Sequence, residues 1–175
     1  MTSDAMKGRG PEETPELVLR RIERRYQTLA ELSPVGIFHS DAAGHYSYVN
    51  ERWCQITSLP ADEARGDGWM SALTPADAER VVHEWQRVVR GGLVFGAEYR
   101  VRRRDGSVRW VLGQAFPETD PEAGVVGYMG TITDVTERKY ADEYVRQSEE
   151  RYRILFDHNP LPMWCTTRRP WASWR

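Results

Sequence analysis

The sequence has few of the features that mark a secreted, metal-binding or membrane-spanning protein. Only two of its 175 residues are cysteines, Cys54 and Cys165, and neither lies in a CxxC pair. A disulfide framework and a zinc site are therefore not indicated. No apolar run approaches the roughly 18 residues that span a bilayer, and the N-terminus lacks the apolar segment of a signal peptide. We expect a cytoplasmic protein without membrane insertion.

Charge is equally uninformative about a partner, because 24 basic residues nearly balance 26 acidic ones and leave a net charge of −2. The segment "YRVRRRDG" is a basic run that could contact phosphates. On a strand, however, Arg100 and Arg102 point to one face and Val101 to the other, which favours a solvated edge strand. We therefore predict no nucleic-acid partner. The sequence shows no recognisable pair of nucleophile and base, no glycine-rich phosphate-binding loop, and no phosphoacceptor or ATP-binding motifs of a kinase. We therefore predict no enzyme activity for this chain.

The N-terminal part divides into a polar tail and a helix. Residues 1–14 are polar, and we expect a disordered tail. Residues 15–33 should form an N-terminal signalling helix, because their apolar residues recur at a spacing of three and four: Val18, Ile22, Tyr26, Leu29 and Leu32. Such a narrow stripe is typical of a coiled-coil seam. We expect a homodimer that forms through the helices flanking the central domain.

The central region, residues 34–136, alternates short strand and helix signals. "SPVGIFHSD" and "GHYSYVN" read as two strands, and Asn50 is a plausible N-cap for "ERWCQIT". "TPAD", Thr74 to Asp77, has the form of a capping box and should begin a longer helix. Asp105-Gly106 lies between two alternating runs and indicates a hairpin. After a loop, "PETDPEAG", "VVGYMGTITDV" is the last strand. The pattern predicts an α+β fold with a five-stranded antiparallel sheet and short helices on one side.

Four segments in this order carry a family resemblance: "VNERWCQIT", "GWMSALTPADAERV", "YRVRRRDGSVRWV" and "GYMGTITDVTERK". Together they resemble a Per-Arnt-Sim (PAS) domain with its C-terminal PAC motif. The resemblance implies a five-stranded antiparallel sheet around a small interior pocket, with a helix that leaves the last strand and transmits signals. It also implies the usual context of bacterial regulators, such as sensor histidine kinases of two-component systems and cyclic-di-nucleotide enzymes.

The last strand runs into a charged helix, residues 137–157, with no glycine or proline between them. A helix fused to a strand would pass on a movement of the sheet that a flexible linker would absorb. Asp134, Thr136, Glu137 and Arg138 form the predicted signal junction. Asp134 or Thr136 can cap the helix, and Glu137 lies in its first turn. In the resembled family the acid of this motif often pairs with a basic residue; the alternative is a simple helix cap.

The sequence near the end of the chain repeats a segment from near its beginning. "RYQTLAELSPVGIFHSD" from Arg25 matches "RYRILFDHNPLPMWCTT" from Arg151, but the sequence stops soon after Thr167. We expect residues 158–175 to be the truncated start of a second PAS domain, left by a truncated or frameshifted gene or by a fragment of a longer regulator. The downstream output domain would then be missing from this chain.

No cofactor is predicted, although haem and flavin remain alternatives. Haem-binding relatives use a histidine on the long central helix, but His83 falls on the charged face of that helix. Cys54 lacks the motif of flavin-bonding cysteines and reads as a small core residue. His39 and His45 read as ordinary sheet residues. An interior pocket, if open, would be lined by Ile37, Trp53, Ile56, Val101, Trp110, Leu112 and Ile132; alternatively these side chains simply fill the core.

The sequence therefore predicts a sensory and signal-relay PAS module that hands a conformational change from its sheet to its C-terminal helix. Two other readings stay open. The domain could be a receptor for a small molecule or cofactor, or it could be a purely structural dimerisation module that binds no ligand.

Overall fold

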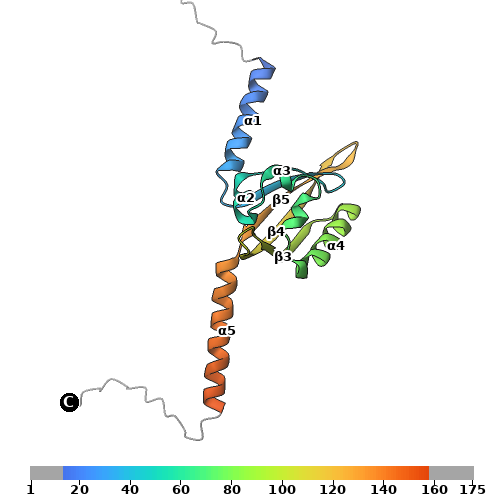
Figure 1. Ribbon diagram of the computed structural model, residues 1–175. Helices are drawn as coiled ribbons and strands as arrows, with labels where there is room; N and C mark the ends of the chain where they lie inside the picture. The colour runs from blue at the N-terminus through green and yellow to red at the C-terminus, as the bar shows by residue number, and fades with distance from the viewer. Residues whose placement is uncertain (1–13, 158–175) are drawn as a thin grey trace, which may run out of the picture. The chain divides into compact units, whose positions relative to one another are not determined.

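The computed structural model describes residues 14–157 (Figure 1). Almost all of the predicted tail and the whole of the predicted second copy, residues 158–175, lie outside this range. The chain separates into two compact units, one ending at Thr136 and the other beginning at Glu137. The first unit contains the sheet, and the second is formed by the C-terminal helix.

The first unit is built on five antiparallel strands, as predicted. They are β1 (Gly36–Asp41), β2 (Tyr46–Val49), β3 (Phe95–Arg102), β4 (Val108–Asp120) and β5 (Gly124–Asp134). Their order in the sheet is β2-β1-β5-β4-β3, so the last strand in sequence lies at the centre. The central strand pairs with β1 on one side and with β4 on the other.

The hairpin of β4 and β5 is longer than the sequence predicted. "PETDPEAG" was expected to be a loop, but Thr119 pairs with Val125 and Asp120 with Gly124, so only residues 121–123 connect the strands. The Asp120 carboxylate closes this turn by accepting the main-chain N–H groups of Glu122 and Ala123. Because this tight turn needs only three residues, the rest of the segment predicted as a loop pairs as strand on both sides of the turn.

Short helices cover one face of the sheet (Figure 1). They are α2 (Glu51–Thr57), α3 (Ala61–Ala64), the 3-10 helix η1 (Gly68–Ala72) and α4 (Pro75–Gly91). Asn50 caps α2 as predicted, because its side-chain oxygen accepts the N–H of Trp53 at 2.9 Å. The α4 residues Val81, Trp85 and Val88 are buried against the sheet, so this longer helix forms where the sequence predicted one.

Two further helices flank the sheet in sequence. The helix α1 (Pro15–Glu31) belongs to the first unit and has an amphipathic sequence, yet none of its residues is buried. The helix α5 (Thr136–Asp157) forms the second unit apart from its first residue. Ion pairs along α5 join Arg146 to Glu143 and Glu150, which suits a helix with an exposed charged surface.

The centre of the sheet has no room for a side chain at Gly130. A Cβ atom built on this residue would lie 2.6 Å from the carbonyl oxygen of Gln114 and 2.6 Å from Cε1 of Phe38. The Phe38 ring, which is 1% exposed, occupies that space instead. Glycine at this position therefore lets β5 pass directly over an aromatic ring.

Gly130→Ala should lower the free energy of unfolding by about 2 kcal/mol, because the added methyl group must displace either a ring or a strand. Chemical denaturation measures this change. Gly96→Ala is the matched control, since Gly96 lies on the edge strand β3 and a Cβ atom there meets no atom within 4 Å. Equal stability of the two variants would contradict the packing described at Gly130.

Candidate functional site

Strand β5 passes to helix α5 through a single residue. The strand ends at Asp134, the helix begins at Thr136, and only Val135 lies between them. The sequence predicted this directness from the absence of glycine and proline. How the junction is held to the sheet depends on contacts with β4 that the sequence did not reveal.

The main chain of Trp110, in β4, holds both residues that follow Asp134. Its carbonyl oxygen accepts the N–H of Val135 at 2.9 Å. Its N–H donates to the hydroxyl oxygen of Thr136 at 2.9 Å. Both Val135 and Thr136 are buried. The first residue of α5 is therefore hydrogen-bonded to the sheet through its side-chain hydroxyl.

The Asp134 carboxylate also contributes contacts to this junction. One of its oxygens accepts the main-chain N–H of Thr136 at 3.0 Å, and the other lies 3.3 Å from the Arg109 guanidinium. An acid paired with a base at this point is the arrangement that the family resemblance implied. The Arg109 side chain is 40% exposed, so the pair orients the junction more than it stabilises the fold.

A second set of contacts leads from Trp110 across β3 to helix α4. The guanidinium carbon of Arg100 lies 5.2 Å from the centre of the Trp110 ring, within the range of a cation–π contact. The same guanidinium donates through Nε to the Asp77 carboxylate at 2.7 Å, and the Arg100 main-chain N–H donates to the same oxygen at 3.0 Å. Asp77, in the first turn of α4, is thus linked to the residue that holds Thr136.

This arrangement corrects the role predicted for Asp77. The "TPAD" motif does begin a helix, but no side chain caps the main-chain N–H groups at its start. Asp77 instead accepts hydrogen bonds from Arg100 and Arg80, and the Thr74 hydroxyl donates to it. The hydrogen bonds from Arg100 hold the pKa of the Asp77 carboxyl well below its usual range. A local capping motif cannot show that an arginine on a neighbouring strand, distant in the sequence, binds the acid of the motif.

The other two predicted junction residues, Glu137 and Arg138, lie on the first turn of α5 with exposed side chains. Glu137 is placed where a negative charge favours the start of a helix, as expected. The described contacts bring Asp134 and Thr136 together at the sheet. Arg109, Trp110, Arg100 and Asp77 complete the site, and sequence reasoning had not assigned these four to it.

The seven predicted pocket-lining residues divide between the two faces of the sheet. Trp53, Ile56, Val101 and Ile132 are buried among the helices, whereas Ile37, Trp110 and Leu112 are only partly buried and lie on the opposite face. The prediction that all seven line one interior space is therefore wrong for these three. The sequence predicted correctly that apolar residues alternate along β4. It did not show that the larger ones, Trp110 and Leu112, point away from the helices.

Aromatic rings fill much of the helix-covered face. Tyr46 stacks on Phe38 at a centroid distance of 4.4 Å and on Trp69 at 5.0 Å. The Trp85 ring meets five other aromatic residues edge-on. The Trp69 Nε1–H is buried and has no hydrogen-bond partner among the described residues. This group is the one polar feature of the described core that a small ligand or a water molecule could satisfy.

The histidines and the described cysteine take ordinary places. His83 is exposed on α4, as predicted. His39 lies on β1 between the Ser47 hydroxyl at 2.7 Å and the Glu118 carboxylate at 2.8 Å, and His45 lies beside Asp41 in the following turn. Cys54 is half-buried against the core, and burial raises the pKa of its thiol. Residues 14–157 contain no group of three or more side chains that could hold a metal ion.

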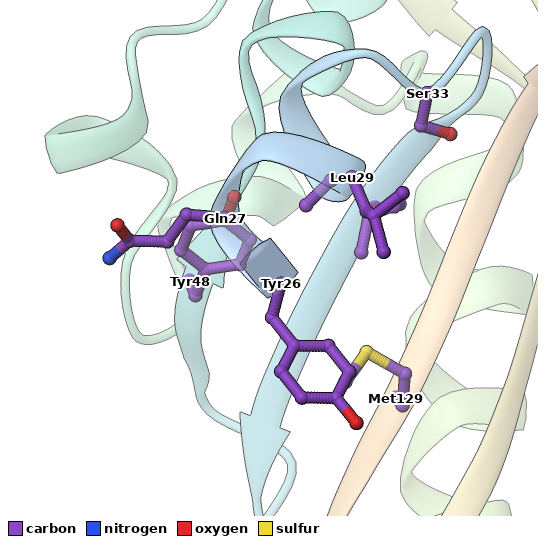
Figure 2. Close-up of a pocket in the computed structure, with 8 residues that line it drawn as sticks. Tyr26, Gln27, Leu29, Ser33, Tyr48 and Met129 are labelled. Carbon is purple, nitrogen blue, oxygen red and sulfur yellow. The ribbon is translucent and has the colours of Figure 1, made fainter. Parts of the chain in front are cut away.

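The open face of the sheet carries an apolar cavity of about 370 Å³ beside the end of α1. Tyr26 and Leu29 come from the helix, and Ile37, Tyr48 and Met129 come from the strands below it. Figure 2 shows the Tyr26 ring next to Met129 and the Leu29 side chain above the sheet. Several of these residues remain exposed, among them Tyr26 at 70% and Leu29 at 60%.

Among the described residues, no helix combines the length and the hydropathy that a membrane span requires.

The sheet order, the helices on one face and the strand-to-helix junction define an antiparallel α+β domain built to connect its central strand to a helix. A sequence model described as "PAS fold" matches residues 46–132. The chain thus contains a domain that belongs to the PAS family, and the resemblance noted in the sequence is confirmed.

Individual relatives agree with this assignment. The uncharacterized protein y4lL of Sinorhizobium fredii is 28% identical over 87% of this chain and 18% of its own length. The peroxide stress-activated histidine kinase mak1 of Schizosaccharomyces pombe is 28% identical over 76% of this chain and 9% of its own. The chain therefore spans less than a fifth of the length of either relative.

A solved structure of a sensory box histidine kinase/response regulator from Burkholderia thailandensis is 25% identical, with a TM-score of 0.56. The match covers 75% of this chain and 99% of that one. The domain is therefore related to the PAS domains of sensor kinases, which supports a sensory role in signal transduction.

The Asp77 interaction predicts a specific acid sensitivity. A carboxyl group whose pKa is lowered by folding contributes stability above its unfolded value, near about 4, and loses that contribution as the pH falls. Asp77→Asn cannot titrate, so it should cost on the order of 2 kcal/mol at pH 7 and lose less stability on acidification than the natural chain. Urea unfolding at a series of pH values measures both effects.

Arg100→Gln provides the matched comparison, because it removes the group that chiefly lowers the Asp77 pKa. In that background Asp77→Asn should cost clearly less than it does alone. Identical costs in the two backgrounds would show that the two side chains do not interact.

Proposed function

We propose that this chain is a cytoplasmic sensory and relay module that passes a conformational change from its sheet to α5. The observation that carries the proposal is the pair of hydrogen bonds between the Trp110 main chain and the residues Val135 and Thr136. Because these bonds tie the start of α5 to β4, a shift of β4 must move the helix or break them. A simple helix cap would need only the Asp134 carboxylate.

The proposed organisation assigns a role to each segment. Residues 15–33 form an N-terminal signalling helix, residues 34–136 the PAS domain with its PAC motif, and residues 137–157 the linker helix that carries the output. The parent protein would be a larger sensor regulator, either a histidine kinase or a cyclic-di-nucleotide enzyme, and its catalytic domain would lie outside this chain. Support comes from the similarity to sensor kinases that are several times longer.

The contacts of Arg100 supply an input to this relay. Asp77 lies in the first turn of α4, which packs on the sheet, and its carboxylate holds Arg100 over the Trp110 ring. A displacement of α4 would therefore change the position of Arg100, and with it the packing of the residue that holds Thr136. Helix movements of about 1–2 Å are a common way for such changes to begin.

We also propose that the module works as a homodimer through its flanking helices. An amphipathic α1 that buries none of its residues needs a partner for its apolar stripe, in which Tyr26, Leu29 and Leu32 are all more than half exposed. In α5, Tyr140, Tyr144 and Tyr152 are likewise exposed at helical spacing. The apolar cavity beside α1 continues this exposed surface onto the open face of the sheet.

A receptor function is the second candidate, and the unpartnered Trp69 Nε1–H favours it. A small ligand with a hydrogen-bond acceptor could satisfy this group and displace one of the rings stacked around Tyr46. That displacement would reach α4 through Trp85, which contacts Trp69 at 6.4 Å between ring centroids. The receptor and relay functions are therefore compatible.

Arg100→Gln should loosen the junction without unfolding the domain. Loss of the cation over Trp110 should lower the hydrogen-exchange protection of the Trp110 and Val135 amides by about tenfold, while amides of the β1–β5 ladder keep theirs. Exchange followed by NMR measures each amide separately. Arg102→Gln is the control, because Arg102 lies two residues further on the same strand and its side chain has no described partner. A uniform loss across the sheet, or none at the junction, would refute the proposed input.

Leu29→Lys should dissociate the dimer, because a lysine placed in an apolar helical seam must lose its hydration. We expect the dissociation constant to rise at least about tenfold, which corresponds to roughly 1.4 kcal/mol. Sedimentation over a range of protein concentrations measures it. Thr28→Lys adds the same charge beside the stripe and should leave association unchanged. A Leu29→Lys variant that remains dimeric would exclude α1 as the contact.

A further inference from the structure

A polar cavity of about 320 Å³ lies where the hairpin of β3 and β4 meets the helices. Three consecutive arginines of the hairpin, Arg102, Arg103 and Arg104, line one side of it. Ser58 after α2, Glu63 of α3 and Ser71 of η1 line the other. The hairpin and the consecutive segments between residues 57 and 72 therefore bring three cations and two serine hydroxyl groups to one space.

The charges in this cavity are unequally matched. Arg104 pairs with Glu63, and Arg103 donates to the Ser58 hydroxyl at 2.8 Å and lies 3.4 Å from Asp105. The Arg102 side chain makes no hydrogen bond or ion pair with any described residue. The cavity thus has a local excess of positive charge in a chain whose net charge is −2. Such a local excess attracts anions whatever the overall charge of the protein.

The main-chain conformation of Ser58, which lines this cavity, is unusual. It is the only non-glycine residue in the described range with a positive φ, 57°, at a position after a helix where glycine is the usual choice. The left-handed backbone directs the Ser58 hydroxyl to Arg103 Nε, so a strained residue positions one of the three arginines.

We propose that this cavity binds a small anion that carries two or more phosphoryl groups. Guanidinium groups match the oxygens of phosphate in geometry and charge. The Ser58 hydroxyl, which accepts from Arg103, can donate its own hydrogen to the same oxygens. A singly charged ligand would gain little, because Glu63 already supplies one carboxylate. A ligand of higher charge can engage Arg102 and compete with Glu63 for Arg104. The volume suits a small molecule, and the site is independent of the relay proposed above.

Isothermal titration of the whole chain with pyrophosphate, at constant ionic strength, tests this proposal. We expect saturable binding at one site that sulfate and chloride do not reproduce. Arg102→Gln should weaken binding at least about fivefold, close to 1 kcal/mol. This variant removes no described contact, so the fold should be retained. Glu63→Gln should strengthen binding, because it frees Arg104 from its competing partner.

Arg87→Gln is the matched control, since Arg87 is an exposed arginine of α4 that pairs with Glu84 outside the cavity. It should bind pyrophosphate as the natural chain does. Amide chemical shifts on titration should change at Ser58, Ser71 and Arg103. Absence of saturation, or equal weakening by the Arg102 and Arg87 variants, would overturn the proposal.

Discussion

The pairing of Trp110 with the residues after Asp134 is the interaction on which the organisation of this domain depends. Without it, β5 would end as an ordinary strand and α5 would begin as an ordinary capped helix. The Trp110 carbonyl extends the main-chain pairing of β4 and β5 by one residue, to Val135, and the Trp110 N–H holds the next residue through the Thr136 hydroxyl. The start of the helix thereby becomes part of the sheet, and this is what makes a relay mechanically reasonable.

Side-chain volume decides which face of β4 points to the helices. Val111, Gly113 and Ala115 are small and face inward, where the large rings of neighbouring elements leave little space. A Cβ atom at Gly113 would lie 2.8 Å from Cε1 of Tyr99 and 3.2 Å from Cε1 of Phe95. The larger Trp110, Leu112 and Phe116 consequently face outward. The same choice that packs the core leaves an apolar open face for α1 and for a partner.

The polar contacts of the site include residues to which the local sequence had suggested a different role. Asp77 looked like part of a capping box, and Arg100 looked like a solvated charge on an edge strand. In the folded domain they meet, since the start of α4 lies against the edge of β3 and the main chain of Thr74 bonds to Arg100. A side chain with several acceptable local partners takes the one that tertiary packing desolvates, and the sequence does not say which that is.

Local chemistry in the sequence by itself determined the elements of this protein and their order. Asn50 begins a helix, Asp105-Gly106 turns a hairpin, alternation marks the strands, and the absence of a breaker joins β5 to α5. These features act over a few residues, so their consequences can be read without the fold. Tertiary structure alone decided which face of β4 is buried, which partner Asp77 takes and where the three arginines of the hairpin gather. Those outcomes depend on register and volume between segments far apart in the chain, and a local pattern is compatible with either alternative.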